Sequence, residues 1–66
     1  MKEFYVSFET SDGFEICNTY IYAEDMEDAI SKAKDHALSL YKTPENMAVY
    51  EVDKMDDEYE GEYVKI

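Results

Sequence analysis

Carboxylates crowd the last part of the sequence, and they have the clearest capacity for metal or charge recognition. Between residues 51 and 62 there are seven acids against one base, Lys54. The acids are Glu51, Asp53, Asp56, Asp57, Glu58, Glu60 and Glu62. Such a run can bind calcium, imitate a polyanion, or form a solvated edge that discourages sheet-to-sheet aggregation.

The spacing of these acids only partly fits a calcium loop. Asp56, Glu58, Glu60 and Gly61 fall at positions 1, 3, 5 and 6 of an EF-hand loop. The bidentate glutamate of position 12 has no counterpart, since the sequence ends at Ile66, and no flanking helices are predicted. We therefore expect no metal site and no cofactor.

Imitation of a polyanion fits the same residues better. Alternate residues of an extended chain place carboxylates on one side about 6.6 Å apart, close to the through-space separation of neighbouring phosphates. Glu51 with Asp53, and Glu58 with Glu60 and Glu62, have this spacing. Such a surface would occupy a basic nucleic-acid channel, and its negative field would speed association.

Catalysis has few candidate residues. Cys17 lies in a predicted strand and is typical of a small buried apolar residue, while His36 lies at the edge of a predicted helix stripe. The sequence contains no glycine-rich phosphate loop and no triad spacing. We expect no enzymatic activity, and a Cys17–His36 pair is the catalytic alternative.

Composition indicates a single folded domain spanning residues 1–66. The chain has a formal net charge of −11, yet 45% of its residues are hydrophobic, a fraction that argues against disorder. The single cysteine forms no internal disulfide, and no apolar run reaches the roughly 18 residues of a membrane span. We expect a cytoplasmic protein without membrane contact.

Alternation of apolar and polar residues predicts a β-hairpin at the start. Residues 3–9 and 14–22 are the predicted strands, and Asp12-Gly13 favours a type I′ turn. The second strand changes parity, so we predict a bulge near Cys17-Asn18 that turns Phe14 and Ile16 toward the core.

A helix follows, with Asp25 as the predicted N-cap and Asp28–Lys32 as an i,i+4 pair, and Pro44 is expected to end it. Its apolar stripe is Met26, Ala29, Ile30, Ala33, Ala37, Leu40 and Tyr41. Residues 47–55 and 62–66 are predicted strands, separated by a loop at 56–61. Their predicted inward residues are Ala48, Tyr50, Val52, Val64 and Ile66.

The order ββαββ predicts an α+β fold, in which one helix packs on one face of a four-stranded antiparallel sheet of order 2-1-3-4. The other face is then open. Its predicted residues are Tyr5, Ser7, Glu9, Glu15, Tyr20, Tyr22, Val49, Glu51, Asp53 and Tyr63. Tyrosine is enriched at protein interfaces, although strand tyrosines also serve β-propensity and cross-strand pairing. The carboxylates argue against direct binding of nucleic acid.

One stretch of the sequence resembles small proteins of phages and mobile elements. It covers residues 6–33 and joins the Asp-Gly hairpin to Tyr22-Ala23-Glu24-Asp25-Met26-Glu27-Asp28-Ala29-Ile30. With the acidic tail and the one-helix sheet, the whole chain resembles small inhibitors of the anti-CRISPR and DNA-mimic type. The resemblance lies in architecture and composition, and no residue role is carried over from it. It implies binding to a nuclease or its nucleic-acid-binding subunit, in the host cytoplasm if the protein is phage-encoded.

Together these features predict a small acidic inhibitor or adaptor that docks on the basic surface of another protein, such as a nuclease complex. The expected partner-binding residues are Glu51, Asp53, Asp56, Asp57, Glu58, Tyr59, Glu60, Glu62, Tyr5, Tyr20, Tyr22 and Tyr63. The alternative is a structural or regulatory module that forms a homodimer through the tyrosine-rich face.

Overall fold

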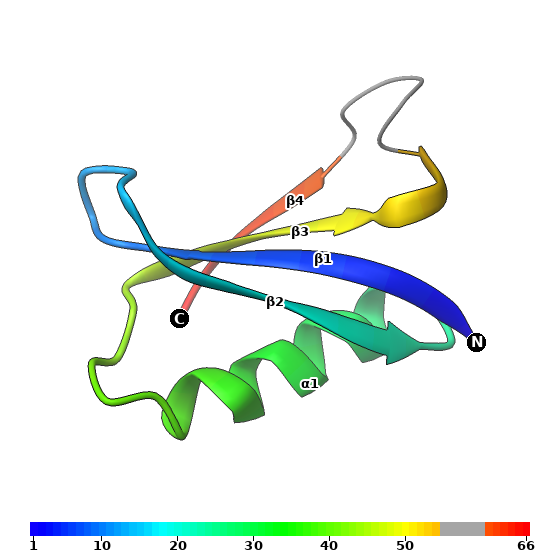
Figure 1. The fold of residues 1–66 in the computed structure, drawn as a ribbon, viewed down its shortest axis with the longest axis horizontal. Coiled ribbons are helices and arrows are strands. Elements are labelled where there is room, and N and C mark those ends of the chain that lie inside the picture. Colours follow the sequence, from blue (N-terminus) through cyan, green and yellow to red (C-terminus); the bar gives the residue numbers. More distant parts are fainter. Residues whose placement is uncertain (55–60) are drawn as a thin grey trace.

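A computed structural model describes residues 1–54 and 61–66. The elements are β1 (Lys2–Glu9), β2 (Glu15–Ala23), α1 (Met26–Leu38), β3 (Asn46–Glu51), the 3₁₀ helix η1 (Val52–Lys54) and β4 (Gly61–Lys65). The strands form one antiparallel sheet of order β2-β1-β3-β4, and α1 crosses one of its faces (Figure 1). The predicted fold class and strand order are confirmed.

The turn between β1 and β2 differs from the predicted type I′ turn. The Gly13 N–H donates to the Thr10 carbonyl, and the Thr10 N–H donates to the Phe14 carbonyl. Only Gly13 has a positive φ, of 88°, whereas a type I′ turn requires a positive φ at Asp12 as well. The observed pattern is that of a type I turn followed by a left-handed glycine, which explains why glycine is needed at position 13.

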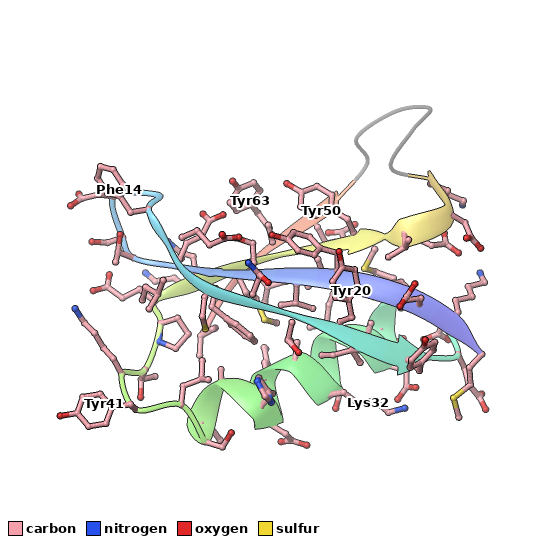
Figure 2. All side chains as sticks on the ribbon, viewed as in Figure 1. Phe14, Tyr20, Lys32, Tyr41, Tyr50 and Tyr63 are labelled. Carbon is pink, nitrogen blue, oxygen red and sulfur yellow. The ribbon has the colours of Figure 1, made fainter. Side chains whose placement is uncertain are left out.

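The predicted bulge in β2 is present, but it lies just before the predicted position at residues 17–18. The register of β1 and β2 shifts between Phe8 and Glu9, which leaves Ile16 as the extra residue. The bulge does not bury the apolar residues at the hairpin end. Phe14 is 73% exposed and Ile16 is 38% exposed, because this end of the hairpin extends away from α1 (Figure 2). Their predicted core positions were wrong.

Local hydrogen bonds fix where α1 begins. The Asp25 carboxylate accepts from the Asp28 N–H at 2.8 Å, which confirms the predicted N-cap. The Asp28 carboxylate in turn accepts from the Glu24 N–H at 3.2 Å and pairs with Lys32 at 3.2 Å. These contacts, the Glu24 hydrogen bond first and the Lys32 contact second, lower the pKa of Asp28.

The helix ends earlier than predicted. Its last residue is Leu38, and the Ser39 hydroxyl and N–H both donate to the His36 carbonyl. Tyr41 was predicted in the buried stripe, but it lies after the helix and is fully exposed (Figure 2). No helix of the described residues is long and apolar enough to cross a membrane.

The core lies between α1 and the sheet. The helix contributes Ala29, Ala33 and Ala37, each fully buried, and their small side chains let the helix axis approach the strands closely. The sheet contributes Phe4, Val6, Phe8, Ala23, Met47 and Val49. Val64 and Ile66 are partly buried against this cluster, as their predicted inward positions require.

The face of β3 that meets the helix is the opposite of the predicted one. The sequence predicted Ala48, Tyr50 and Val52 on the core face. Instead, Val49 lies opposite Val6 and Glu51 lies opposite Phe4, so this set faces α1. Ala48 and Tyr50 therefore belong to the sheet face opposite α1, and Val52 lies beyond the strand in η1.

Overpacking at the alanine contact provides a test of this core. We expect Ala33→Leu to cost about 1–3 kcal/mol of unfolding free energy, because a fully buried alanine leaves no room for the added atoms. A domain of this size has only roughly 3–5 kcal/mol in total, so thermal unfolding followed by circular dichroism should show a large fall in Tm. Ser31→Leu is the control, since residue 31 is exposed on the same helix and should leave Tm nearly unchanged.

Candidate functional site

The sheet face opposite α1 is the main candidate surface, because no described element covers it (Figure 1). Four predicted partner-binding tyrosines lie on it: Tyr5, Tyr20, Tyr22 and Tyr63. Tyr20, Tyr22 and Tyr63 are 58%, 61% and 70% exposed. Tyr50 joins them although it was predicted inward, so this "open face" carries five tyrosines of the described residues, of which Figure 2 labels Tyr20, Tyr50 and Tyr63.

The centre of the open face is an aromatic cluster. Tyr5 meets Tyr20 edge to face with ring centroids 5.4 Å apart, and it stacks with Tyr50 at 6.4 Å. The Tyr50 ring lies over Gly61, its cross-strand neighbour on β4, where a Cβ would overlap the ring. These rings come from β2, β1 and β3, so the sheet itself holds them side by side.

Glu15 organises the polar part of the open face. Its Oε1 accepts from the Ser7 hydroxyl at 2.7 Å and from the Tyr5 hydroxyl at 2.8 Å, while its Oε2 accepts from the Asn18 side chain at 3.3 Å. The hydrogen bonds from Ser7, Tyr5 and Asn18 lower the pKa of Glu15. Glu9 pairs with Glu15 across the strands, and its carboxylate lies 3.4 Å from the Ser7 hydroxyl.

The open face is electrically negative. Glu3, Glu9 and Glu15 lie on it, and the one lysine at the corresponding positions of the described strands is Lys65, at the end of β4. Three ion pairs occur among the described residues: Lys2–Glu51, Lys32–Asp28 and Lys54–Glu51. None involves Glu3, Glu9 or Glu15, so the open-face carboxylates are not neutralised within the described part of the chain.

Two C-terminal acids of the described residues, Glu51 and Glu62, are separated from this face. Glu51 lies on the helix side of the sheet, 3.2 Å from Lys54 and 3.4 Å from Lys2. These two lysines, Lys54 first, lower the pKa of Glu51 and compensate its charge. Asp53 is exposed in η1, and Glu62 is exposed on the helix side of β4, opposite Val49.

Five predicted partner-binding residues, Asp56, Asp57, Glu58, Tyr59 and Glu60, lie outside the described residues. Within the described residues, the structure does not place the acids between residues 51 and 62 beside the tyrosines.

A hollow of about 570 Å³ lies on the helix side, beside the first turn of α1. It is lined by Lys2, Phe4, Met26, Glu51, Lys54, Gly61 and Glu62. Both lysines already pair with Glu51, so the hollow offers no uncompensated cation for an anionic ligand. Within residues 1–54 and 61–66, no group of three His, Cys, Asp or Glu side chains is placed to hold a metal ion.

Cys17 and His36 both lie next to Phe8. Cys17 pairs with Phe8 across the strands and is partly buried, while the His36 ring stacks on the Phe8 ring at 5.7 Å. The two side chains, both within the described residues, form no hydrogen bond with each other. Their positions are those of residues packed at the rim of the core.

The hydrogen bond to Glu15 should be visible in the titration of Tyr5. This bond, together with burial and the negative charge of Glu15, raises the pKa of Tyr5 to about 12. We expect the Tyr5 phenol, followed by ¹³C NMR, to stay protonated near pH 11. In Glu15→Ala it should titrate closer to the ordinary value of about 10. An unchanged Tyr5 titration in the variant would show that this bond does not exist in solution.

Stability should also depend on Glu15 at low pH. Because the pKa of Glu15 is lower in the folded state, its contribution to stability is present above the unfolded-state pKa of about 4.3 and is lost as the pH falls through the folded-state pKa. Urea unfolding should therefore show Glu15→Gln less stable than the wild type at pH 7, with the difference shrinking below about pH 4. Glu45→Gln removes an exposed carboxylate and is the matched control for the loss of a charge at pH 7.

Comparisons of this chain with protein-family models, with curated proteins and with solved structures give no match. Function is therefore inferred from the surface chemistry of the described residues. The features that bear on it are the five tyrosines and the three uncompensated carboxylates of the open face.

Proposed function

We propose that this protein is a non-catalytic binding module, an inhibitor or adaptor that docks on a basic surface of another protein. The observation that supports this best is the open face, with its central ring cluster and its carboxylates that pair with no lysine. A soluble domain that leaves such a face uncovered has apolar area available for a partner, and tyrosine tolerates water until the partner arrives.

The chemistry of the open face favours a cationic partner. Arginine and lysine side chains are attracted to the faces of tyrosine rings, and Tyr20, Tyr22 and Tyr63 are exposed enough to receive them. Glu15 is held in place by three donors, and a carboxylate has roughly four acceptor sites, so it can still accept from a guanidinium. The net charge of −11 would attract such a partner from a distance.

A finer form of the proposal is that the partner's surface normally binds nucleic acid, as for inhibitors of the anti-CRISPR and DNA-mimic type. The overall charge supports it, as does the alternate spacing of Glu58, Glu60 and Glu62 in the sequence, whereas Glu51 and Asp53 lack the extended backbone that this spacing requires, because Val52–Lys54 is a 3₁₀ helix. Glu51 contributes little to such imitation, because Lys2 and Lys54 compensate it. In this form the acids at Asp53 and beyond act as a second contact, in addition to the open face.

Affinity capture with matched tyrosine variants tests the role of the open face. With the protein as bait in a lysate of its native source, we expect a basic partner. Its affinity, measured with the purified partner, should fall at least about tenfold in Tyr20→Ser/Tyr63→Ser, because aromatic anchors carry much of an interface's binding energy. Tyr41→Ser is the control, since Tyr41 is even more exposed but lies off the sheet. Raising the salt from about 50 mM to about 500 mM should weaken binding.

Further outcomes separate the forms of the proposal. Competition by DNA for the captured partner, together with weaker binding after neutralising Asp56, Asp57, Glu58 and Glu60, would support occupation of a nucleic-acid site. Capture of an acidic partner would contradict the proposal. An affinity that changes neither with salt nor in the tyrosine variants would contradict it as well. A tight dimer in sedimentation that Tyr5→Ser or Tyr63→Ser abolishes would instead favour the homodimeric module.

A further inference from the structure

The strand β2 forms one outer edge of the sheet, so one side of its backbone has no neighbouring strand among residues 1–54 and 61–66. Across the hairpin, the Thr10 N–H donates to the Phe14 carbonyl. On the β3 side, the Glu9 carbonyl accepts from the Glu45 N–H. Even-numbered residues of β1 therefore direct their N–H and C=O groups toward β2, since these directions alternate along a strand.

The same alternation identifies the β2 residues that face outward. The partners of the even-numbered β1 residues are Cys17, Thr19, Ile21 and Ala23, which use their backbone groups in the sheet. Asn18, Tyr20 and Tyr22 then direct theirs to the free edge. The Lys32 ammonium donates to the Tyr22 carbonyl at 3.0 Å, which agrees with this assignment and covers one end of the edge (Figure 2).

The middle of this edge lacks the usual protection against pairing with other strands. Natural proteins protect exposed edges with charged side chains, prolines, β-bulges or short strands, and in β2 such features lie only at the ends, the bulge at Ile16 and Lys32 beside Tyr22. Residues 16–23 contain no charged residue, proline or glycine, although 35% of the whole chain is charged. The other edge strand, β4, has five residues and carries both Glu62 and Lys65. The sheet therefore has one protected edge and one long edge that is open to pairing.

Charge indicates what kind of strand would pair there. The uncharged stretch is bounded by Glu15 at one end and by Glu24 and Asp25 at the other, and the exposed rings of Tyr20 and Tyr22 flank it on the open face. On the helix side, the side chains of the same stretch are Cys17, Thr19 and Ile21, which carry no charge to attract a cation. A complementary strand would thus carry its basic side chains on the open-face side and apolar ones on the helix side.

We infer that the free edge of β2 accepts an extended basic segment of the partner as a fifth, antiparallel strand. Antiparallel pairing continues the arrangement of the whole sheet. A second copy of the protein is disfavoured as the occupant, because each copy has a net charge of −11. The inference rests on the proposed function and specifies how the partner is held.

A peptide as long as β2, with arginine and valine in alternation, serves as the probe for NMR titration of the ¹⁵N-labelled protein. In an antiparallel pair, residues opposite Asn18, Tyr20 and Tyr22 share the open face and direct their N–H groups to β2. The arginines would occupy these positions. We expect shifts and slowed amide exchange at Asn18, Tyr20 and Tyr22.

Two N-methylated forms of the peptide test the backbone pairing. Methylation of every arginine amide should abolish binding, whereas methylation of every valine amide should leave the affinity within about threefold, because those N–H groups would point away from β2. A peptide with glutamate in place of arginine should not bind. Equal affinities of the two methylated forms, or the reverse order, would overturn the antiparallel fifth strand.

Two variants of one residue test the protein side. Asn18→Pro removes an N–H that faces the free edge and should weaken binding by about tenfold while the fold is retained. Asn18→Ala loses the same side chain, with its hydrogen bond to Glu15, but keeps the N–H, and should bind more tightly than Asn18→Pro. Circular dichroism checks that both variants fold.

The remaining outcomes overturn the edge inference in distinguishable ways. Chemical-shift changes centred on Tyr5, Tyr50 and Tyr63, with equal binding of the two methylated peptides, would support docking on the open face. They would rule out pairing at the edge of β2. Sedimentation that shows a dimer without peptide, lost in Asn18→Pro, would identify a second copy as the occupant. Absence of any chemical-shift change at millimolar peptide would also overturn the edge inference. Failure of the proposed function itself would appear differently, as a captured partner that is acidic or whose binding does not change with salt.

Discussion

The structure depends on one packing constraint, namely that a single helix covers one face of a four-stranded sheet. Ala29, Ala33 and Ala37 let α1 lie close to the strands, and the two phenylalanines of β1 fill the space that remains. A core this small supplies only roughly 3–5 kcal/mol of stability, so it cannot be divided to cover both faces. The second face must therefore be stable in water, and tyrosine with carboxylate satisfies that condition while leaving apolar area exposed.

The arrangement of charge adds a second constraint. An excess of eleven negative charges in a small domain opposes folding through self-repulsion. Local contacts offset part of it: Lys32 pairs with Asp28 near the helix start, and two lysines compensate Glu51. On the open face, Glu15 is stabilised by hydroxyl and amide donors instead of lysine. Its charge thus remains uncompensated by the ion pairs of the described residues.

Much of the fold could be predicted because the hydrophobic periodicity, the helix cap and the loop lengths all indicated the same order of elements. Asp25 had the residue type and position of an N-cap, and the order of elements left one simple antiparallel sheet. The face of β3 could not be predicted in this way, since Met47, Ala48, Val49 and Tyr50 are all apolar or aromatic and show no alternation. Tyr50 was consequently missed as an open-face residue. Its cross-strand neighbour Gly61 was a usable signal, because aromatic rings often cover a glycine on the next strand.

The open face and the free edge of β2 are coupled by strand geometry. In the described part of β2, Asn18, Tyr20 and Tyr22 turn their side chains to the open face, and the same residues turn their backbone groups outward. A strand paired there would have its own open-face side chains held beside the tyrosines and Glu15 by backbone hydrogen bonds alone. Backbone pairing supplies affinity without sequence preference, and the side chains on one face supply the preference for positive charge. The bulge at Ile16 limits this edge on one side and Lys32 limits it on the other, so the geometry favours a short extended segment over a long one.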